Sequence, residues 1–236
     1  MPAEKKIHKK LQQQHYETPI AKERRIWIEI IIYSLMIYVL IGGYYLVTNA
    51  SFTSRLFNRS IADLALILMG LSLMLSSVCY FWDFADSFIK YRKHLGLIGF
   101  GYMIVHILMS VLMSQYSPFT KYYLSDYRIF SFSAAAVATV IFTIMALISN
   151  RFSIIEIGPK RWRHLMRVGI IGFALTLYHF SVNGFKFWAP WLTGKSENLF
   201  PAFGMIVFFF GVVVIGLRIA LFIATTFHSS KRNGAS

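Results

Sequence analysis

The chain has 236 residues, of which 56% are hydrophobic and only 14% charged, and its formal net charge is +14. Soluble domains carry about a quarter of charged residues, so the composition excludes a soluble globular protein. The single cysteine, Cys79, excludes an intrachain disulfide and a cysteine-cluster metal site. We therefore expect an all-α, polytopic protein embedded in a lipid bilayer.

Six apolar segments are each long enough to cross a hydrocarbon core of about 30 Å, which takes roughly 20 helical residues. In chain order they are residues 26–47, 61–82, 95–113, 129–148, 168–187 and 201–225. Their connections are short, which predicts one six-helix domain over residues 26–227. Residues 1–25 are expected to form a basic cytoplasmic tail, and residues 228–236 a short one.

The basic residues alternate between the two sides of these segments. The tails and alternate connections hold 17 Lys and Arg residues, whereas the other connections hold six. By the positive-inside rule, both termini are cytoplasmic, and the membrane of a bacterial source would be the inner one. Because the charge is divided among short juxtamembrane segments, it indicates contact with lipid headgroups and no binding of nucleic acid.

Two stretches nearly repeat each other: GLIGFGYMIVH, which ends at His106, and GIIGFALTLYH, which ends at His179. A seven-residue offset is nearly two helical turns, so Gly99 shares a face with His106, and Gly172 with His179. Two such strips facing each other would form a slot for a flat cofactor with one nitrogen ligand from each side. Imidazole suits iron, and the pattern therefore predicts a haem held by two histidines.

Both histidines lie about 12 residues beyond the last basic residue before them, roughly 18 Å into a core of about 30 Å. Polar groups at this depth are costly, which favours a functional role. The alternative is a non-redox transporter or assembly subunit, in which both histidines are structural or relay protons. At the cytoplasmic helix ends, Arg92 and Arg163 offer partners for the phosphate of a flavin or the propionate of a second haem.

The repeated stretches also carry a resemblance to a known family. The segment YRKHLGLIGFGYMIVH, residues 91–106, is similar to the basic, Leu-Gly-Leu, aromatic-rich third helix of the ferric reductase-like transmembrane family. GPKRWRHLMR, residues 158–167, followed by Leu-Tyr-His179, resembles the loop and fifth helix of one member, the bacterial haem subunit of the periplasmic methionine sulfoxide reductase system. Metalloreductases of the six-transmembrane epithelial antigen type and NADPH oxidase membrane domains belong to the same family.

The resemblance implies a b-type cytochrome with haem b held by His106 and His179, either an oxidoreductase itself or the haem subunit of one. Met166 stands where the bacterial subunit has the inner histidine of two-haem members. A single haem is therefore expected, although an inner pair of His94 with His164 or Met166 stays open. No Gly-rich dinucleotide motif follows a strand, so the parallel implies a separate reductase, a flavin (FMN or FAD) or a quinone as donor. The acceptor is expected outside, as ferric iron or a partner oxidoreductase.

Three further expectations concern the outer side. Asn58-Arg59-Ser60 and Asn49-Ala50-Ser51 match the N-glycosylation pattern. Asp63 lies near the end of its segment, where it is expected to reach water. Tyr45 and Trp188 fit an aromatic belt at the outer interface.

Overall fold

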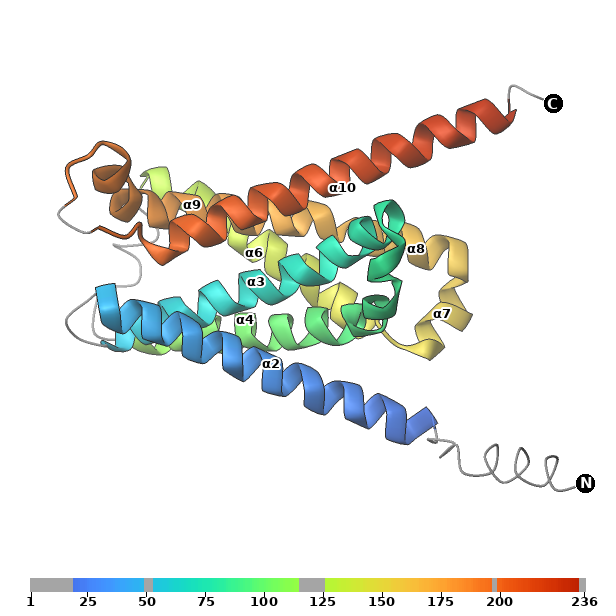
Figure 1. The fold of residues 1–236 in the computed structure, drawn as a ribbon, viewed down its shortest axis with the longest axis horizontal. Coiled ribbons are helices and arrows are strands. Elements are labelled where there is room, and N and C mark those ends of the chain that lie inside the picture. The colour runs from blue at the N-terminus through green and yellow to red at the C-terminus, as the bar shows by residue number, and fades with distance from the viewer. Residues whose placement is uncertain (1–18, 49–52, 115–125, 197–198, 234–236) are drawn as a thin grey trace, which may run out of the picture.

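The computed structural model describes residues 19–48, 53–114, 126–196 and 199–233 (Figure 1). Within these residues the chain is helical and contains no strand. Six helices are long and apolar enough to cross a membrane, which confirms the predicted polytopic all-α fold. They lie in α2 (Pro19–Thr48), α3 (Ser54–Phe81), α4 (Arg92–Ser114), α6 (Asp126–Leu147), α9 (Gly169–Leu192) and α10 (Phe203–Asn233).

The connections at one end of the bundle are themselves helical. They comprise a 3-10 helix, η1 (Asp83–Tyr91), and two short helices, α7 (Arg151–Ile157) and α8 (Pro159–Arg167). The Asn150 side chain caps α7 by accepting from the Ser153 amide at 2.8 Å, and Gly158, with φ of 83°, turns the chain into α8. Trp162 Nε1 donates to the Ile148 carbonyl at 3.0 Å and so ties α8 to the end of α6.

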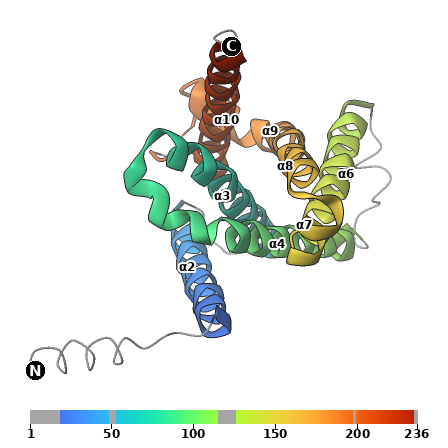
Figure 2. The same ribbon diagram turned by 90° about the vertical axis from the view of Figure 1, so that its right-hand side faces the viewer.

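Helix α3 is the centre of the packing. It contacts α4, α10 and α2, and 44% of its apolar stretch is buried, against 17–22% for the other spans. Helices α3 and α4 form one closely packed pair, and α6 and α9 form a second. The second pair contacts the first mainly through α10 (Figure 2). The two histidines described below, with their hydrogen-bond partners, lie on these two pairs, α3 with α4 and α6 with α9.

The start of α2 and the end of α10 lie at the same end of the bundle as η1, α7 and α8 (Figure 1). We call this the basic end, because the segments there hold most of the described Lys and Arg residues, namely Lys22, Arg24, Arg25, Lys90, Arg92, Lys93, Lys160, Arg161, Arg163 and Arg167. Its cytoplasmic location stays a prediction from the charge.

Near the opposite end, a buried polar group joins α2 to α3. Asp63 is fully buried, and Tyr45 Oη donates to its Oδ2 at 2.5 Å. Trp188 is also buried, 3% exposed, against Phe180 and Phe208. The expectations that Asp63 reaches water and that Tyr45 and Trp188 line a headgroup belt are therefore wrong, because α2, α3, α9 and α10 converge here and enclose these side chains.

Candidate functional site

His106 lies on α4, half-buried, and reaches back to the first turns of α3. Its Nδ1 is 2.9 Å from Oδ1 of Asn58 and 3.2 Å from the carbonyl oxygen of the same residue. Asn58 Nδ2 in turn donates to Ser110 Oγ at 2.9 Å, which orients the amide with Oδ1 toward the ring. Since both partners of Nδ1 are acceptors, Nδ1 carries the proton, and the Nε2 lone pair is available to a ligand.

His179 on α9 has the same arrangement with α6. Its Nδ1 is 3.0 Å from the carbonyl oxygen of Ser131 and 3.1 Å from the hydroxyl of that residue. Asn183 Nδ2 donates to the His179 carbonyl at 2.8 Å, and it comes no closer than 3.5 Å to Nε2. This second imidazole therefore also keeps its proton on Nδ1 and its lone pair on Nε2.

The two arrangements are copies of each other in the chain. Each histidine meets a partner 48 residues earlier, and the pair Asn58 and His106 is offset from Ser131 and His179 by 73 residues. The same offset relates the packing contacts: a Cβ on Gly96 would meet Ser72, and one on Gly169 would meet Met145. Helices α3 and α4 thus form a first hairpin, and α6 with α9 a second hairpin of the same design.

The glycines predicted to line the cofactor serve these hairpins. A Cβ on Gly99 would lie 2.8 Å from Met69 Cγ and 3.0 Å from the Met69 backbone nitrogen, both on α3. One on Gly172 would lie 3.0 Å from Ile141 and 3.3 Å from Phe142, both on α6. The sequence predicts that the faces of Gly99 and Gly172 would face each other across a slot. They do not, because each face is covered by the other helix of its own hairpin.

The histidine helices themselves pack on their hairpin partners and make little or no contact with each other. Figure 2 shows the two hairpins side by side, and Figure 1 shows α4 and α9 both running away from the basic end. Among the described residues, no group of three or more His, Cys, Asp or Glu side chains converges as a metal cage.

This donor set fits a haem. Iron in a b-type haem takes one axial nitrogen from each side, and the structure offers one half-buried imidazole from each hairpin. Ligating histidines commonly donate their other N–H to a carbonyl, which fixes the tautomer and raises the basicity of the ligand. Both Nδ1 atoms have such a carbonyl, from Asn58 and Ser131.

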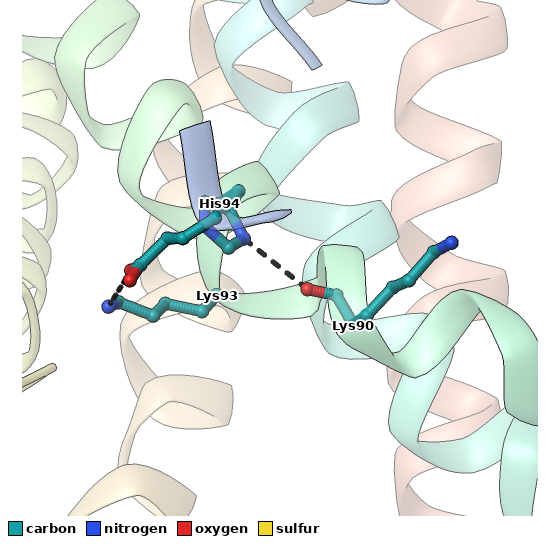
Figure 3. Close-up of polar contacts among 4 residues, drawn as sticks. Lys90, Lys93 and His94 are labelled. Carbon is teal, nitrogen blue, oxygen red and sulfur yellow. Dashed lines mark hydrogen bonds and ion pairs between the residues drawn. The ribbon is translucent and has the colours of Figure 1, made fainter. Parts of the chain in front are cut away.

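The structure does not assemble the possible inner ligand set. His94 is 5% exposed, its ring meets Trp27 of α2 edge-on at 4.8 Å, and its Nε2 has no hydrogen-bond partner among the described residues. Figure 3 shows its Nδ1 directed at the Lys90 carbonyl, 3.3 Å away. His164 is exposed on α8 and Met166 half-buried, and no contact in the described part of the chain joins either residue to His94.

The two arginines predicted to hold a phosphate or propionate both lie at the basic end. Arg92 begins α4 and is half-buried, and its carbonyl accepts from Ser72 Oγ at 2.7 Å. Arg163 is exposed on α8. The described contacts do not bring the two side chains together, so their role stays a prediction.

The fold and the site together define a helical integral membrane protein with paired imidazoles inside the membrane-spanning region. Residues 61–177 match the family described as the ferric reductase like transmembrane component. The chain therefore contains a ferric reductase-like transmembrane domain over these residues, as the two motifs predicted, and this domain suggests transmembrane electron transfer. The match includes His106 and ends two residues before His179. No curated protein matches the chain.

Sequence reasoning missed Asn58 and Ser131, the partners of the two histidines. Asn58 is wrongly expected to be a glycosylation acceptor: it is 9% exposed, and its amide is engaged by Ser110 and His106. The other candidate, at residues 49–51, lies outside the described residues. The 73-residue offset that relates His106 to His179 also relates Asn58 to Ser131, so aligning the two repeats at this offset pairs two polar residues.

Proposed function

We propose that the chain is a b-type cytochrome that moves electrons across the membrane, with one haem b held by Nε2 of His106 and Nε2 of His179. The observation that supports this most directly is the matched hydrogen bonding of the two Nδ1 atoms, which leaves both lone pairs for a ligand. The match of residues 61–177 to the ferric reductase-like family supports the same class of activity. Bound haem supplies the reversible one-electron iron couple.

The chain's own residues supply the ligands, their orientation and an apolar surrounding. The carbonyls of Asn58 and Ser131 keep each ring in one tautomer and increase its electron donation toward Nε2. Buried apolar side chains of both hairpins, among them Met103, Phe173 and Leu177, exclude water from the same region. Catalysis of this kind requires positioning and redox tuning and no protein nucleophile.

The direction of transfer follows from the charge. With the basic end in the cytoplasm and both termini inside, the histidines lie nearer the outer surface, since each lies about 12 residues, roughly 18 Å, beyond the last basic residue before it. The donor is a separate reductase, a reduced flavin or a quinone, and Arg92 and Arg163 offer it anion partners at the basic end. The acceptor at the outer side is ferric iron or a partner oxidoreductase.

The test is the absorbance spectrum of the full chain, purified in detergent after expression with added haem precursor. We expect a b-type spectrum with one haem per chain, lost in His106→Ala and in His179→Ala. His164→Ala is the matched control, because this exposed histidine lies outside the site, and it should retain the spectrum. A wild-type protein without haem, or full haem retention in both site variants, would overturn the proposal in favour of the transporter or assembly subunit.

A further inference from the structure

The two histidine environments use the same residue types in exchanged positions. In the first hairpin the early helix contributes Asn58 and the late helix Ser110, four residues after His106. In the second hairpin the early helix contributes Ser131 and the late helix Asn183, four residues after His179. Each environment is thus one Asn and one Ser joined by a hydrogen bond, with the order reversed.

The exchange changes what the ring nitrogen meets. Nδ1 of His106 has two carbonyl-type acceptors, the Asn58 amide oxygen at 2.9 Å and the backbone oxygen at 3.2 Å. Nδ1 of His179 has one backbone carbonyl at 3.0 Å and a hydroxyl at 3.1 Å. A carboxamide oxygen is the stronger acceptor of the two side chains, so the His106 ring is polarised more.

The side chains are also held to different degrees. Asn58 is anchored to Ser110 at 2.9 Å, whereas the corresponding Asn183 to Ser131 distance is 3.4 Å. Both environments close on the helix that carries the histidine: Ser110 donates to the His106 carbonyl and Asn183 to the His179 carbonyl, each at 2.8 Å, so the difference lies in the contact between Asn and Ser. The first environment is therefore the tighter of the two, and its amide is fixed with the oxygen toward the histidine.

We infer that Asn58 and Ser131 are positioning residues, and that Asn58 polarises His106 more than Ser131 polarises His179. This difference makes His106 the stronger electron donor of the two proposed ligands. The inference rests on the proposed function. A stronger bond from Nδ1–H increases the electron density at Nε2, which stabilises the ferric over the ferrous state. Asn58 thereby lowers the midpoint potential of the site more than Ser131 does.

The experiment uses the full holoprotein and measures its midpoint potential and its low-spin ferric electron paramagnetic resonance spectrum. Asn58→Ala should raise the ratio of reduced to oxidised protein at a fixed potential about tenfold, which is 59 mV for one electron. Ser131→Ala should change this ratio less, because both variants keep the backbone carbonyl and this one removes only the weaker side-chain acceptor, the hydroxyl at 3.1 Å. Ser60→Ala is the control on the same helix, since its hydroxyl contacts only the Phe57 carbonyl in the described contacts.

A milder exchange tests the asymmetry itself. The double variant Asn58→Ser with Ser110→Asn gives the first hairpin the order of the second, and its spectrum should report two more nearly equal ligands. Equal shifts in Asn58→Ala and Ser131→Ala, or a double variant with the wild-type potential, would overturn the inference. If these variants bind haem and still depend on both histidines, the proposed function stands even where the inference fails.

Discussion

Gly99 gives the sharpest test of the hairpin packing that positions His106. Replacing it with alanine places a methyl group 2.8 Å from Met69 Cγ, 3.0 Å from the Met69 backbone nitrogen and 3.1 Å from Leu68 Cβ. A flexible side chain can turn aside, but a backbone nitrogen of α3 cannot. The two helices of the first hairpin must therefore separate, and His106 moves with α4 away from Asn58.

Gly101 on the same helix is the matched control, because a Cβ there meets nothing within 4 Å. Both substitutions gain the same helix propensity, about 1 kcal/mol for alanine over glycine in a helix interior. The difference between the two variants is then the packing cost alone, about 1–3 kcal/mol for an overpacked contact. Gly172→Ala should fall between them, since its neighbours Ile141 and Phe142 present side chains that can shift.

The assay is thermal unfolding of the purified protein in detergent, followed by circular dichroism, with haem content measured in parallel. For a chain of this size about 2–4 °C of melting temperature corresponds to 1 kcal/mol, so Gly99→Ala should melt roughly 2–12 °C below Gly101→Ala. Its haem content should fall as well. Equal melting temperatures for the two variants would refute the close approach of α4 to α3 at Gly99.

Two further predictions concern other parts of the bundle. Tyr45→Phe removes the hydrogen bond to the buried Asp63 carboxylate and should destabilise the protein by about 1–3 kcal/mol. Tyr33→Phe, on the exposed face of α2, is the control. An unchanged melting temperature in Tyr45→Phe would show that the burial of Asp63 does not depend on this hydrogen bond. Met166→His should leave the ratio of haem to protein at one, because His94 packs on Trp27, and a ratio of two by haem extraction would refute that placement.

The membrane-spanning helices could be read from the sequence because a bilayer demands long apolar runs. The predicted segment 61–82 corresponds to Ser54–Phe81, and 129–148 to Arg128–Leu147. The basic connections were harder: charged segments at the interface give no apolar run, and η1, α7 and α8 were expected only as connections. Hydropathy therefore predicts what crosses the membrane and not what lies at its surface.

The two histidines could be identified as candidate ligands from the sequence, whereas the residues that support them could not. His106 and His179 stand out as polar residues in apolar helices, which one sequence is enough to reveal. The role of Gly99 depends on which helix covers it, and periodicity alone cannot distinguish a face that packs on a neighbouring helix from one that lines a cofactor. Asn58 and Ser131 are 48 residues from their histidines and differ from each other, so identity between the repeats does not reveal them.

The internal repeat also explains why one pair of histidines is expected and a second is not. Two hairpins that run in the same direction, related by a 73-residue offset, place equivalent residues at the same depth on either side of one central region. His106 and His179 are such equivalents. Applied to His94, the same offset leads to Arg167, with Met166 beside it. The second hairpin has no histidine at the position equivalent to His94, whose ring packs against Trp27 instead. The repeat therefore pairs His106 with His179 and leaves His94 without an equivalent histidine.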